Sequence, residues 1–93
     1  MKRRFEFEFD DQSPRGTISF DYDEAVDERM SILVENDVSV LYANRAALVF
    51  LAKAFIKMAL CPYPDGFHFH LNQDLDADRP EALRVTLNET GKT

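Results

Sequence analysis

Aromatic and charged residues alternate strictly at the start of the chain. Three phenylalanines alternate with charged residues over residues 4–10, which is the period-two pattern of a strand with one buried face. A stretch with Pro14 and Gly16 at turn-forming positions follows, and apolar and polar residues alternate again over residues 17–22. Together these segments predict a β-hairpin.

A second hairpin is predicted further along the chain. Residues 30–35 and 38–43 are both rich in β-branched and apolar side chains, and Asn36-Asp37 lies between them. Asparagine and aspartate tolerate the positive φ angles that a two-residue hairpin turn requires. Residues 23–29, which precede this hairpin, are charged and show no clear period. They are compatible with a loop or a single helical turn.

One long helix is predicted over residues 45–60. Asn44 is a good N-cap, and Cys61-Pro62 ends the helix because the residue before a proline disfavours helical geometry. At 100° per residue, one face is apolar and is expected to form the core contact. This expected core face consists of Leu48, Leu51, Phe55 and Met58, with Ala47, Ala52, Ala54 and Ala59 beside them.

The opposite side of this helix carries an unexpected set of apolar residues. Arg45, Lys53 and Lys57 form a basic stripe there. That stripe is flanked by Val49, Phe50, Ile56 and Leu60. Fully exposed, these flanks would make an apolar patch, which we expect either residues 23–29 or a second chain to cover. Because residues 23–29 contain little apolar surface, the sequence favours the second chain.

Two further strands complete the predicted fold. Residues 66–72 and 83–89 alternate, a polar loop separates them, and a tail from about residue 90 is expected to be disordered. The predicted order is β-β-β-β-α-β-β in one α+β domain spanning residues 1–93. We expect a two-layer sandwich in which one helix covers an antiparallel sheet of five to six strands. The residues expected to be buried are Phe7, Phe20, Leu51, Phe55, Phe69 and Val85.

His68 and His70 are the most conspicuous candidates for chemistry. Alternate residues of a strand point the same way, so the two imidazoles could supply two ligands to a metal such as zinc. A site needs at least one more ligand, and no neighbouring residue has a diagnostic spacing. The simpler interpretation places both histidines on the solvent face of a strand. No catalytic constellation or phosphate-binding glycine loop is present, so we expect neither enzymatic activity nor a cofactor.

The negative charge of the chain is concentrated in its first part. The net charge is −6, and residues 1–37 hold eleven acids and five bases, whereas the remaining residues balance. This distribution argues against nucleic acid as a partner, because phosphate binding needs a basic face. It suits a basic protein partner, and it also serves solubility. With one cysteine and neither a signal-like nor a membrane-spanning segment, we expect a cytoplasmic protein with no membrane attachment.

The segment from residue 37 to residue 89 resembles a known family. The order of a short strand, a polar cap, a helix rich in Leu and Ala, a turn and an "H-x-H-L" strand is similar to immunity protein family 32 of bacterial polymorphic toxin systems. The matching positions are Asn44, Leu48, Leu51, Ala52, Gly66, His68, His70 and Leu71. The resemblance implies a cytoplasmic protein that binds a cognate toxin and blocks it.

The first functional hypothesis is therefore a non-enzymatic protein-binding domain that neutralises a partner, such as a basic toxin domain, by occlusion. The residues expected to contact the partner are His68, His70, Glu6, Glu8, Phe50, Val49 and Ile56. Two alternatives stay open: a small metal-binding protein or metalloenzyme that uses the two histidines, and a structural homodimer.

Overall fold

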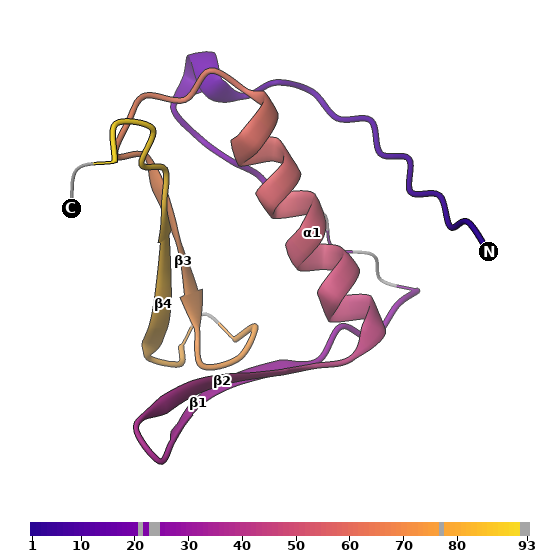
Figure 1. Cartoon of the computed structure of the whole chain (residues 1–93), viewed down its shortest axis with the longest axis vertical. Coiled ribbons are helices and arrows are strands. Elements are labelled where there is room, and N and C mark those ends of the chain that lie inside the picture. The colour runs from indigo at the N-terminus through magenta and orange to yellow at the C-terminus, as the bar shows by residue number, and fades with distance from the viewer. Residues whose placement is uncertain (21, 23–24, 77, 92–93) are drawn as a thin grey trace.

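The structure, a computed structural model, describes residues 1–20, 22, 25–76 and 78–91. Within these residues it contains one long helix and two separate antiparallel two-stranded sheets (Figure 1). The elements are the short 3-10 helix η1 (Ser13–Arg15), β1 (Met30–Glu35), β2 (Val38–Ala43), α1 (Arg45–Leu60), β3 (His68–Asn72) and β4 (Glu81–Thr86). The α+β class is confirmed, but the single sheet of five to six strands is wrong.

The β1–β2 hairpin forms as its sequence predicts. Asn36 and Asp37 have φ angles of 51° and 65°, so both turn residues adopt the left-handed conformation that a tight hairpin needs. The register places Glu35 opposite Val38 and Met30 opposite Ala43 without a bulge. The turn therefore fixes which side chains of the hairpin face α1.

The N-cap of α1 joins the helix to the loop before β1. The Asn44 side-chain oxygen accepts hydrogen bonds from the backbone N–H of Ala47 at 2.9 Å and of Arg29 at 3.0 Å. Its amide nitrogen donates to the carbonyl of Asp27 at 2.7 Å. One asparagine thus caps the helix and positions residues 27–29. The helix ends at Leu60, before the extended residue Cys61, as the following proline predicts.

The N-terminal segment forms no strand in its described residues, so the predicted first hairpin is wrong there; residue 21 lies outside the described part of the chain. Residues 1–10 instead run beside α1, on the side away from the β3–β4 hairpin (Figure 1), whereas Phe20 contacts both α1 and β3. Phe20 stacks on Phe50 with ring centroids 5.6 Å apart. The centroid of the Phe7 ring lies 5.2 Å from the Lys53 ammonium, in a cation–π contact. The phenylalanine pattern thus produces contacts with a helix rather than with a sheet.

These contacts rotate the buried face of α1 by about 80° from the expected one, at 100° per residue. The buried residues of the helix are Ala47, Phe50, Leu51, Ala54, Lys57 and Met58. Lys57 is only 5% exposed, and its ammonium donates to the carbonyl of Ser19 at 2.9 Å and to the Ser19 hydroxyl at 3.2 Å. The expectation that Lys57 faces away from the core is therefore wrong.

The predicted core is correct only in part. Leu51 and Phe69 are buried, and the expected burial is confirmed for both. Phe7, Phe20 and Val85 are half-buried. Phe55 is 45% exposed, contrary to expectation, because the rotation of α1 turns it toward solvent.

The β3–β4 hairpin presents two chemically different faces. Phe69 and Leu71 are buried against α1, while His68 and His70 point outward, as their alternation predicts. A register shift lies between Leu71 and Asn72. One backbone hydrogen bond, from the N–H of Ile32 to the carbonyl of Gln73 at 2.7 Å, joins the two hairpins at the outer edge of β1.

The expected disordered tail lies only partly within the described residues. Residues 92–93 are outside them. Before that point, the Asp65 carboxylate accepts from the backbone N–H of Glu89 at 2.8 Å and from the Thr90 hydroxyl at 3.2 Å. The chain after β4 is thus attached to the turn before β3.

Candidate protein-binding surface

His68 and His70 lie side by side on the outer face of β3. Their ring centroids are 5.0 Å apart and the rings are perpendicular. The Nδ1 atom of His68 is 3.2 Å from the carbonyl oxygen of Gly66, and that of His70 is 2.9 Å from the Glu81 carboxylate. Among the described residues, no group of three or more His, Cys, Asp or Glu is placed to hold a metal ion. Each histidine has a partner within its own hairpin.

The Glu81 carboxylate contacts both Arg84 and His70 on this outer face. It accepts hydrogen bonds from the Arg84 Nε at 3.1 Å and Nη2 at 3.3 Å. These bonds, followed by the contact with His70, lower the pKa of Glu81 from 4.5 to about 2. A carboxylate held by a two-pronged guanidinium stays ionised at all physiological pH values.

The titration of Glu81 provides a direct test of this cluster. By carboxyl NMR we expect a titration midpoint of about 2 in the native chain, and a rise toward 4.5 in an Arg84→Gln variant. His70→Gln should raise the midpoint less, because Arg84 is the larger cause. Since the folded pKa is depressed, the stabilisation by Glu81 is complete above pH 4.5 and is lost as the pH falls toward 2. A native midpoint near 4.5 would contradict the arrangement.

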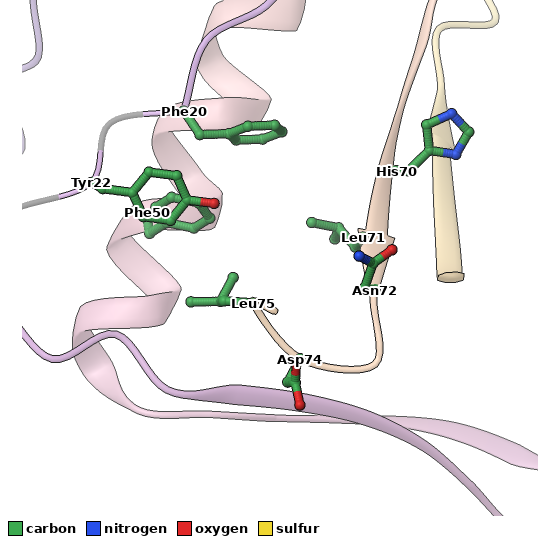
Figure 2. Close-up of a pocket in the computed structure, with 8 residues that line it drawn as sticks. All are labelled: Phe20, Tyr22, Phe50, His70, Leu71, Asn72, Asp74 and Leu75. Atoms are coloured by element: carbon green, nitrogen blue, oxygen red, sulfur yellow. The ribbon is translucent and has the colours of Figure 1, made fainter. Parts of the chain in front are cut away.

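A pocket of about 130 Å³ lies between the N-terminal segment, α1 and the loop after β3 (Figure 2). Its lining residues are Phe20, Tyr22, Phe50, His70, Leu71, Asn72, Asp74 and Leu75. Figure 2 shows the His70 imidazole on the far side of β3, directed away from the cavity. Asp74 is paired with Arg79 at 3.4 Å, and the Asn72 amide donates to the carbonyl of Asp76 at 3.2 Å. The lining that remains is mainly aromatic and aliphatic.

Cys61 is poorly suited to nucleophilic chemistry. Its side chain is buried at the end of α1, and burial is the main cause that raises the pKa of its thiol, followed by the hydrogen bond to the Asp11 carboxylate. The neighbouring Tyr63 hydroxyl donates to the carbonyl of Thr17 at 2.6 Å. Both side chains thus hold the N-terminal segment against the end of the helix.

The side of α1 that faces away from the core is largely apolar. Val49, Ile56 and Leu60 lie within about 40° of one another on the helix, and we call them the outer stripe. All three are exposed, and Leu60 reaches 71%. Lys53 borders the stripe and contacts Phe7, which brings the N-terminal segment to the same side of the molecule. An exposed apolar stripe of this kind is typical of an interaction surface.

The residues expected to bind a partner are only partly brought together. Glu6 and Glu8 are exposed on the N-terminal segment, on either side of Phe7, which contacts Lys53 at the border of the outer stripe. The two histidines lie on the β3–β4 hairpin, across the helix from that segment (Figure 1). Phe50 is 4% exposed and its ring contacts that of Tyr22 with centroids 4.9 Å apart, so its expected place on the exposed flank is wrong. One continuous surface cannot include all seven residues.

Sequence reasoning missed a second apolar area, a groove between α1, β2 and β4. This groove has a volume of about 150 Å³. Its lining residues are Ile32, Ser39, Leu41, Leu51, Phe55, Leu71, Ala82 and Leu83. Leu41, Phe55 and Leu83 are each 45% exposed at its rim. The uncharged sequence of β2 was the available signal, because an edge strand that faces water usually carries a charge.

Within the described ranges, α1 is too short to cross a membrane, and no other helix there is long and apolar enough to do so. Comparisons of this chain with models of known families, with curated proteins and with solved structures find no match.

Proposed function

We propose that this chain is a non-enzymatic protein-binding domain that acts by covering a surface of its partner. The observation that carries the proposal is the exposure of Val49, Ile56 and Leu60 on the outer stripe of α1. Exposed apolar side chains on one helical face gain free energy when a partner removes them from water. The buried Cys61 thiol and the internally paired histidines add support for binding rather than for catalysis.

The partner that suits this surface is a basic protein. Glu6 and Glu8 flank Phe7, which contacts Lys53 at the border of the outer stripe, and residues 1–37 hold all the excess negative charge. Such a field accelerates association with a cationic partner and favours a defined orientation. In light of the sequence resemblance to immunity proteins, the proposed partner is a bacterial toxin domain whose active surface this chain occludes.

The surface is tested by capturing the partner from the native cell with the full chain as bait. We expect a stoichiometric partner that a Val49→Glu, Ile56→Glu double variant binds at least tenfold more weakly, because charges replace the apolar contact. His68→Ala is the matched control on the opposite side of α1 and should bind normally. Equal binding by the native chain and the double variant would exclude the outer stripe as the interface.

The contribution of charge is a separate prediction. A Glu6→Gln, Glu8→Gln variant should associate with the captured partner more slowly than the native chain, and stopped-flow rates of the native chain should fall as salt rises. Association that is independent of salt would contradict a basic partner.

The toxin assignment has its own test. The captured protein should arrest bacterial growth when expressed alone, and co-expression of the native chain should restore growth. Co-expression of the Val49→Glu, Ile56→Glu variant should restore growth less well. A captured protein that does not affect growth would overturn the immunity function while leaving the binding surface in place.

A further inference from the structure

The outer edge of β2 has no partner strand among the described residues. In a hairpin with a two-residue turn, the two residues that flank the turn form backbone hydrogen bonds to each other. Going away from the turn, every second residue does the same with the residue opposite it. Val38, Val40 and Tyr42 therefore bond to β1. Ser39, Leu41 and Ala43 direct their backbone N–H and C=O groups to the other side. The hydrogen bond from Ile32, opposite Leu41, to Gln73 confirms this alternation, because it lies on the outer edge of β1.

No strand in the described part of the chain pairs with the outer edge of β2. Natural edge strands are usually protected by lysine, proline, a bulge or a covering segment. The sequence of β2, "VSVLYA", contains no charge and no proline, and its pairing with β1 is regular. The edge of β1, in contrast, is engaged by Gln73. The edge of β2 is thus suited to receive another strand.

We propose that two copies of this chain pair antiparallel through their β2 edges around a twofold axis. Antiparallel pairing of a strand with its own copy is self-complementary, because each residue makes the contact that its copy returns. Only residues with outward backbone groups can pair. The register that uses all of them places Leu41 opposite Leu41 of the second copy, and Ser39 opposite Ala43 of the second copy.

Charge at the two ends of β2 supports a second copy as the occupant. Asp37 precedes the strand and Arg45 follows it. In the proposed register Asp37 of each copy meets the end that carries Arg45 of the other, so opposite charges lie together. Two chains of net charge −6 repel each other in general, but β2 itself adds no like charges to the contact.

The same pairing covers the groove beside β2. Leu41 forms part of the rim of this groove together with Phe55 and Leu83, and all three are half-exposed in the single chain. A strand added at the β2 edge extends the hairpin and brings a second Leu41 beside the half-exposed Leu41 of this rim. Backbone hydrogen bonds then specify the register, while burial of Leu41 supplies binding free energy.

The oligomeric state of the full chain tests the proposal. Light scattering during gel filtration should give a mass near twice 10.7 kDa at concentrations from micromolar to hundreds of micromolar. Leu41→Lys should reduce the mass to that of a single chain, because two lysines would face each other on the twofold axis. Val49→Lys introduces the same charge at an equally exposed apolar position on α1 and should remain dimeric.

Crosslinking tests the register. In a Cys61→Ala background, a Leu41→Cys chain should crosslink with its own copy under a short thiol-specific reagent. Ser39→Cys alone should not, because its two copies lie four residues apart along the pair, whereas a mixture of Ser39→Cys and Ala43→Cys chains should. A native chain that is monomeric throughout, or a Leu41→Lys variant that melts like the native chain and stays dimeric, would overturn the proposal. Equal self-crosslinking by Ser39→Cys and Leu41→Cys would overturn the register.

Discussion

Phe69→Ala is expected to lower the free energy of unfolding by about 3 to 5 kcal/mol, the usual cost of removing a large buried aromatic side chain. Phe69 is 4% exposed and lies between two other aromatic rings. Its ring centroid is 5.6 Å from that of Phe20, in an edge-to-face arrangement, and 6.1 Å from that of Phe55. It therefore connects the β3–β4 hairpin to both α1 and the N-terminal segment. Chemical denaturation followed by circular dichroism measures the change.

Phe55→Ala is the matched control for this prediction. The same atoms are removed from a side chain that is already 45% exposed, so we expect a loss of about 1 kcal/mol. The dimer proposed above would stabilise the folded chain at high protein concentration, so the comparison belongs in dilute solution. Equal losses for the two variants would show that α1 faces the sheet as the sequence alone predicted.

Local chemistry explains why the middle of the fold was predictable. The turn at Asn36-Asp37, the cap at Asn44 and the stop at Pro62 each depend on backbone preferences of a few neighbouring residues. Such preferences are readable without knowing the tertiary structure. The bounds of β1, β2 and α1 consequently agree with the sequence prediction.

Tertiary contacts explain why the N-terminal prediction failed. The alternation over residues 4–10 indicates that one side of the segment will be covered, but it does not say by what. In the structure Phe7 and Phe9 pack near the ammonium of Lys57 on α1, with centroid distances of 5.8 Å and 6.0 Å. Lys57, rather than a neighbouring strand, covers these two rings. Single-residue propensities do not reveal such a contact.

The candidate surface was only partly predictable for the same reason. The sequence indicated that α1 carries more apolar residues than one face can bury, and two residues of that surplus, Val49 and Ile56, are exposed in the structure. The hydrophobic pattern alone could not distinguish Phe50 from Phe55, because both lie beside an apolar face. Contacts of Phe20 and Tyr22, distant in sequence, decide that Phe50 is the buried one.

Phe50→Glu is expected to unfold most of the isolated chain. The change removes an aromatic side chain that is 4% exposed and contacts the rings of Phe20 and Tyr22, and this loss alone costs about 3 to 5 kcal/mol. It also places a carboxylate at a position almost wholly removed from solvent, which adds to the loss unless the group becomes protonated. Domains of this size have roughly 5 to 15 kcal/mol of stability in total, so the folded population should be small. Circular dichroism and amide NMR dispersion would report the loss.

Val49→Glu is the matched control for the unfolding expected of Phe50→Glu. Val49 is the neighbour of Phe50 in sequence but lies on the outer stripe, where a carboxylate remains in water. We expect its stability to stay within about 0.5 kcal/mol of the native chain, as for most surface substitutions. A folded Phe50→Glu chain that loses partner binding would instead place Phe50 at the interface and reverse the rotation of α1 described above. Adjacent residues with opposite outcomes would show that the helix buries one apolar face in the core and leaves another exposed to solvent.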